Sequence, residues 1–161
     1  MEIYNLAMEN NNEIISDLKG LVNILNDGKE GYESASETTE SVELKSVFLT
    51  YAAQRAAYAA ELKAHLLQHG GASENEDGGV LGVLHRTWID IKQAFTSKED
   101  TAILGAIETG EKAAIEKFDA VLEHPDTHAD HIELLQRQRT GIREALSEIE
   151  TYHHRLENVN E

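Results

Sequence analysis

Histidine and acidic side chains gather at two places in the sequence where a divalent metal could bind. Glu61 and His65 lie four residues apart, and His128 and His131 lie three apart. On a helix both spacings place the two side chains on one face, and imidazole with carboxylate is a ligand set for zinc or another divalent cation. Polar helix ends also collect such residues without a ligand, so the metal stays an alternative here.

Further polar residues fall within segments that otherwise have the pattern of a buried helix face. The first group comprises Arg55, Tyr58, Glu108, Glu111, Gln138 and Arg139. A buried carboxylate is very costly unless a cation pairs with it, so we expect a polar cluster inside the fold. The alternative is that Glu108 and Glu111 flank the core on a solvated face.

A third group, Asp27, Tyr32 and His153, could line a pocket for a small ligand. The competing interpretation is a core histidine that hydrogen-bonds to Asp27 or to a tyrosine. Both interpretations depend on the helices that position these residues.

Apolar residues recur at spacings of three and four along four long segments, which predicts four amphipathic helices. A fifth, shorter amphipathic segment contains Trp88. Gly70-Gly71 is expected to end the second long helix with a left-handed cap. We expect a single all-α domain over residues 1–161 with helices at about 12–36, 41–69, 80–95, 98–123 and 127–158.

The lengths of the links suggest the topology. Those near residues 37–41 and 124–127 are short, so each joins antiparallel neighbours. The link from Gly70 to Ser97 is long and contains its own helix, which can recross the bundle. Two hairpins joined by one crossover form a ferritin-like four-helix bundle, with a simple up-down-up-down bundle as the alternative.

Several short motifs, in their order and spacing, resemble an uncharacterised bacterial family of ferritin-like bundles, from about Leu18 to Leu156. They are Asp27-Gly28 with Gly31-Tyr32, Gln54-Arg55, Gly70-Gly71, His85-Arg86 with Trp88, Glu108 to Glu111, and His153 with Arg155. The resemblance implies the ferritin-like fold and no established activity.

A ferritin-like di-iron centre needs a Glu from each of two helices and a Glu-x-x-His motif from each of the other two. The chain has one such motif, Glu150 to His153, and the corresponding part of the second helix has Arg55 instead. Arginine cannot ligate a metal because it stays protonated and has only donors. We therefore expect no working central di-iron site.

Residues that are equally far from a turn lie side by side on its two antiparallel helices, so counting from the expected turns predicts which residues face each other. With turns near 38–39 and 125, Arg55 lies opposite about Val22, and Glu111 opposite about Arg139. If the second and third long helices run parallel, Arg55 meets Glu108, Glu111 and either Gln138 or Arg139 at mid-bundle. The hypothesis is that a guanidinium occupies the place where related bundles hold metal.

Composition limits the partners. The chain has 30 acidic and 14 basic residues, a formal charge of −16, and no cysteine. This balance disfavours nucleic acid and anionic membranes, and the lack of cysteine excludes disulfides and thiolate sites. An acidic N-terminus without an apolar run predicts a cytoplasmic protein.

The sequence favours a non-catalytic bundle of unknown role that acts by self-association or through a protein partner and has no cofactor. A stress-related role follows by fold analogy alone. One alternative is a metal-dependent oxidase or ferroxidase with a displaced site, using iron, manganese or zinc. The other is a bundle that binds a small ligand near Tyr32, Tyr58 and His153.

Overall fold

The computed structural model describes residues 2–70, 88–124, 127 and 129–159, with side chains from residue 12 onward. Regular secondary structure in this part of the chain is entirely helical, which confirms the all-α prediction. The long helices are α1 (Glu2–Thr38), α2 (Val42–Gln68), α4 (Asp100–Glu123) and α5 (Ala129–Val159). Residues 88–94 are also helical and lead into the 3₁₀ helix η1 (Phe95–Ser97).

Most of the helix ends predicted from the sequence lie close to the ends in the structure. Helix α1 begins at Glu2 rather than near residue 12. The Ser41 side chain caps α2 by accepting a hydrogen bond from the Leu44 N–H at 3.2 Å. Gly70, just after α2, has a φ of 82°, the left-handed conformation expected of a terminating glycine. The first part of the predicted helix 80–95 lies outside the described residues.

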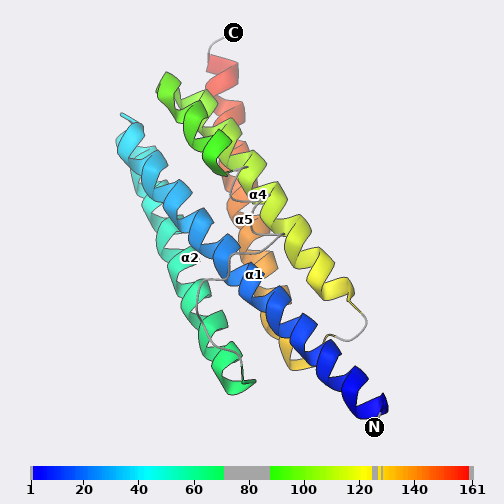
Figure 1. The fold of residues 1–161 in the computed structure, drawn as a ribbon. Coiled ribbons are helices and arrows are strands. Elements are labelled where there is room, and N and C mark those ends of the chain that lie inside the picture. The colour runs from blue at the N-terminus through cyan, green and yellow to red at the C-terminus, as the bar shows by residue number, and fades with distance from the viewer. Residues whose placement is uncertain (1, 71–87, 125–126, 128, 160–161) are drawn as a thin grey trace.

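The four long helices form two antiparallel pairs, α1 with α2 and α4 with α5 (Figure 1). Helices α2 and α4 run in the same direction, and α1 packs against α4 between the pairs. Thr39 ties the turn of the first pair to the second, because its hydroxyl donates to Asp100 Oδ1 at 2.6 Å. No described helix is both long and apolar enough to cross a bilayer.

Among the described residues, the core forms two hydrophobic clusters, one toward each end of the bundle. One contains Leu18, Leu62 and Phe118, and the other contains Phe48 and Ile149 among others. Along α2 the clusters meet between Ala52 and Ala59, and along α4 between Ile107 and Ala114. On both α2 and α4, a charged residue lies in the interval between the two clusters.

Trp88 packs between the two pairs, against glycines of α1 and α4. A Cβ built on Gly31 would lie 1.9 Å from the Trp88 ring, and one on Gly110 would lie 2.9 Å from it. The indole is 4% exposed, so it anchors the segment before η1 to the bundle.

Candidate functional site

Arg55 of α2 and Glu111 of α4 form a buried ion pair between the two hydrophobic clusters. Their side chains are 1% and 0% exposed. Arg55 Nη1 donates to Glu111 Oε1 at 2.6 Å, and Nη2 donates to Oε2, so the contact is bidentate. We call Arg55 and Glu111 the central ion pair.

Tyr32 of α1 completes this centre. Its hydroxyl donates to Glu111 Oε2 at 2.8 Å, and its ring lies 5.4 Å from the guanidinium carbon of Arg55. Gly28, one turn earlier, leaves room for the arginine, because a Cβ there would lie 3.2 Å from Nη1. The glutamate therefore has three donors from two helices, although it is fully buried.

The surroundings fix the protonation of this centre. Burial raises the pKa of Tyr32 well above its usual value, and the neighbouring Glu111 raises it further. Burial alone would lower the pKa of Arg55, but the attraction and hydrogen bonds of Glu111 outweigh it and raise that pKa. At neutral pH the centre therefore contains a neutral Tyr32 phenol and an Arg55 guanidinium cation, and both are hydrogen-bonded to Glu111.

The other members of the expected polar cluster lie apart from the central ion pair. Glu108 contacts His153 Nδ1 at 2.8 Å, and Arg139 donates to Asp119 at 2.6 Å. The Gln138 amide donates to the Tyr58 carbonyl oxygen at 3.1 Å and to Glu61 at 2.9 Å. Within this set, Arg55 and Glu111 are therefore joined, whereas Tyr58, Glu108, Gln138 and Arg139 make their contacts elsewhere.

The residues expected around a ligand pocket also make separate contacts. Tyr32 is 0% exposed and bonded to Glu111. His153 lies between Glu108 and Glu157, at 2.8 and 3.2 Å, rather than against a tyrosine. Asp27 is half-buried on α1.

Near the C-terminal end of α2, His65 lies against His131 of α5, and both are candidate metal ligands. His65 Nε2 lies 2.5 Å from His131 Nδ1. The same place holds two residues that the sequence reasoning missed, His69 and Asp130, whose Nε2 and Oδ2 atoms are 2.9 Å apart. One ligand atom from each of the four residues lies within 4.8 Å of all the others. We call His65, His69, Asp130 and His131 the histidine cluster.

The remaining two metal candidates have a different outcome. Glu61 is held by Arg137 through two hydrogen bonds of 3.0 and 2.9 Å, which lower its pKa. His128 lies outside the described residues. A signal for His69 was present in the sequence, because it follows His65 by four residues and so shares its face of the helix.

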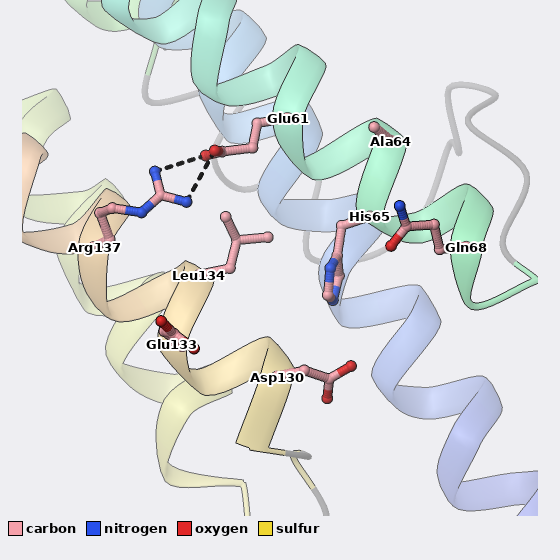
Figure 2. A pocket seen from close by; sticks show the side chains of 8 residues that line it. All are labelled: Glu61, Ala64, His65, Gln68, Asp130, Glu133, Leu134 and Arg137. Carbon is pink, nitrogen blue, oxygen red and sulfur yellow. Dashed lines mark hydrogen bonds and ion pairs between the residues drawn. The ribbon is translucent and has the colours of Figure 1, made fainter.

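An open pocket of about 390 Å³ borders the histidine cluster between α2 and α5 (Figure 2). His65 and Asp130 face this space from opposite helices, and the Glu61–Arg137 pair lies further along it. Burial, and then the nearby His69, lower the pKa of His65, so its ring is neutral at neutral pH. Imidazole nitrogens and a carboxylate can together coordinate one divalent cation.

No curated protein and no solved structure matches this chain. One family does match: residues 13–124 fit the domain of unknown function DUF2383. The matched region runs from α1 to the end of α4 and includes the central ion pair, Tyr32, His65 and His69, while Asp130 and His131 lie beyond it. Because the match covers well over half of the chain, the protein belongs to the DUF2383 family.

Proposed function

We propose that this protein is a non-catalytic, ferritin-like bundle of a bacterial family, which acts through its surface on a protein partner or a second copy of itself. The observation that carries the proposal is the bidentate contact of Arg55 with Glu111 in the middle of the molecule. A permanent cation there fills the place in which a di-metal bundle holds its ions.

The helix directions support the ferritin-like part of the proposal. Two antiparallel pairs, with α2 and α4 running parallel, are the helix directions of a ferritin-like bundle. A simple up-down-up-down arrangement would instead make α2 and α4 antiparallel.

The chemistry of the centre supports a non-catalytic role. Both oxygens of Glu111 already accept hydrogen bonds, and the arginine has no lone pair to offer a metal. Since the interior is filled at this point, function falls to the exposed faces. A stress-related role remains a proposal by fold analogy, and the absence of cysteine fits the cytoplasm as the compartment.

Oxidation of iron(II) tests this proposal directly. Anaerobic protein is mixed with ferrous iron, air is admitted, and the ferric absorbance is followed beside a protein-free control. We expect the protein to leave the rate of oxidation unchanged. An accelerated rate that is lost in Glu111→Gln would overturn the proposal.

Sedimentation equilibrium tests the proposed mode of action. We expect the average mass of the protein to rise with its concentration if it self-associates. If the mass stays that of one chain, affinity capture from the native organism's extract must yield a partner, and failure of both would refute action through the surface.

Specific observations bear on both alternatives. The histidine cluster favours metal binding away from the centre, and an oxidase at that site would accelerate iron oxidation in a way that His69→Ala abolishes. For ligand binding, a second open pocket of about 490 Å³ is lined by Tyr58, Arg137 and Gly141 among others. Tyr32 and His153 are not among its lining residues.

A further inference from the structure

We infer that the histidine cluster is a binding site for a single divalent first-row transition ion, with Zn²⁺ as the ion it suits best. The site lies at the end of the bundle where α2 ends and α5 begins. It does not depend on the proposed function, because no residue of the central ion pair takes part in it.

The positions of the four residues on their helices bring them together. His65 and His69 lie one turn apart on α2, and Asp130 and His131 are at the start of α5. The imidazole centroids of the three histidines are 4.6 to 4.8 Å apart in every pairing. Three rings from two helices thus converge on one point, with a carboxylate beside them.

The separations of the ligand atoms suit one small ion. Zinc–nitrogen bonds of about 2.0–2.1 Å place the ligand atoms of a tetrahedral site about 3.3 Å apart. The observed separations are 2.5 Å for His65 to His131 and 2.9 Å for His69 to Asp130, and none exceeds 4.8 Å. Shifts of about one ångström would therefore form the site.

Two of the ligands are free to make those shifts. The side chains of His69 and Asp130 are 34% and 53% exposed, whereas His131 is 2% exposed and fixed in the fold. The adjoining pocket opens to solvent, which gives an ion a path to His65 and Asp130 (Figure 2). The site thus combines a fixed ligand with adjustable ones.

The donor set selects the class of ion. Three imidazole nitrogens and one carboxylate oxygen suit Zn²⁺, Co²⁺, Ni²⁺ or Cu²⁺, while Mg²⁺ and Ca²⁺ prefer oxygen ligands alone. The formal charge of −16 on the chain attracts cations of any kind. Discrimination between zinc and magnesium must therefore come from the histidines.

Zinc titration of the full chain tests the site. The protein is made without a histidine tag, treated with a chelator and transferred to metal-free buffer near neutral pH. Isothermal titration with ZnCl₂ then measures stoichiometry and affinity, with MgCl₂ as the comparison. We expect one zinc ion per chain and no heat of binding from magnesium.

His69→Ala and Asp130→Asn are the informative variants, since both residues are exposed enough for the changed chain to fold. Changing an outer partner of a metal ligand costs roughly 10–100-fold in affinity, so loss of a ligand is expected to weaken zinc binding by more than about 100-fold. His154→Ala is the matched control, because His154 is an exposed histidine of α5 outside the cluster. It should bind zinc as the unchanged protein does.

Two independent measurements complete the test. Cobalt should give the visible absorption of a tetrahedral site, and zinc should raise the melting temperature of the protein but not that of His69→Ala. The inference is overturned if zinc does not bind. It is equally overturned if His69→Ala and Asp130→Asn bind zinc as tightly as His154→Ala does.

Discussion

Removing the cation from the central ion pair is the sharpest perturbation of this fold. Glu111 is 0% exposed in the unchanged protein, and Arg55→Met leaves it with only the hydroxyl of Tyr32 as a donor. Leaving one member of a buried pair without its partner costs about 3–5 kcal/mol. The two lost charge-assisted hydrogen bonds, at about 1.5–3 kcal/mol each, lead to a similar figure.

A double-mutant cycle separates the pair from the effects of the single changes. In Arg55→Met with Glu111→Leu, apolar side chains replace both charges. Such replacements are often neutral, or stabilising by about 1–4 kcal/mol. We therefore expect the double variant to be more stable than Arg55→Met, with a coupling energy of several kcal/mol.

Urea unfolding followed by circular dichroism measures each free energy of unfolding. The matched control is Arg137→Met, because Arg137 and Glu61 also form a bidentate pair but are 56% and 39% exposed. An exposed pair of this kind contributes about 0–1 kcal/mol. If Arg55→Met costs no more than Arg137→Met, the buried charge is not held as the structure indicates.

Two further changes test the packing and protonation around this centre. The raised pKa of Tyr32 means that the stability it contributes is present below the ordinary tyrosine pKa of 10.0 and is lost as the pH rises above it, toward the folded pKa. Between about pH 10 and 11 the free energy of unfolding should therefore fall by up to about 1.4 kcal/mol more in the unchanged protein than in Tyr32→Phe. Urea unfolding at each pH measures this difference, and an equal fall in both proteins would contradict the expectation. Gly31→Ala should destabilise by about 1–3 kcal/mol because its Cβ would lie 1.9 Å from the Trp88 ring. Gly20→Ala, in the same helix with nothing within 4 Å, should instead stabilise by up to about 1 kcal/mol, so that equal shifts in melting temperature would refute the close packing.

The sequence predicted the helices and the central contact but not the register within each pair. With a turn near 38–39, Arg55 was expected opposite Val22, yet its stem lies against Gly28. Part of the error is the position of the turn, because α1 ends at Thr38 and α2 begins at Val42, which moves the residue opposite Arg55 to about Leu25. The long arginine side chain then reaches Gly28. Tyr32 was consequently assigned to a ligand pocket rather than to Glu111.

Counting from the turn also misplaced Glu108 in the second pair. A turn near 125 places Glu108 opposite Ile142, but it contacts His153, about three turns further along α5. Glu111, three residues later, still faces Arg55, because that contact depends on α2 and α4 running parallel from similar levels. The direction of the helices was therefore enough to predict the contact of Arg55 with Glu111, but not to exclude Glu108, which was expected beside Arg55 as well.

The two candidate sites have a common consequence for how the pairs of helices are held together. The central ion pair joins α2 to α4, and the histidine cluster joins α2 to α5, so α2 takes part in both sites. Apolar packing tolerates sliding of one helix along another, whereas a bidentate ion pair and a set of converging ligands are each satisfied at one alignment. Because a zinc ion would bind only when the ends of α2 and α5 are aligned, its binding would favour the same alignment that the buried charges require.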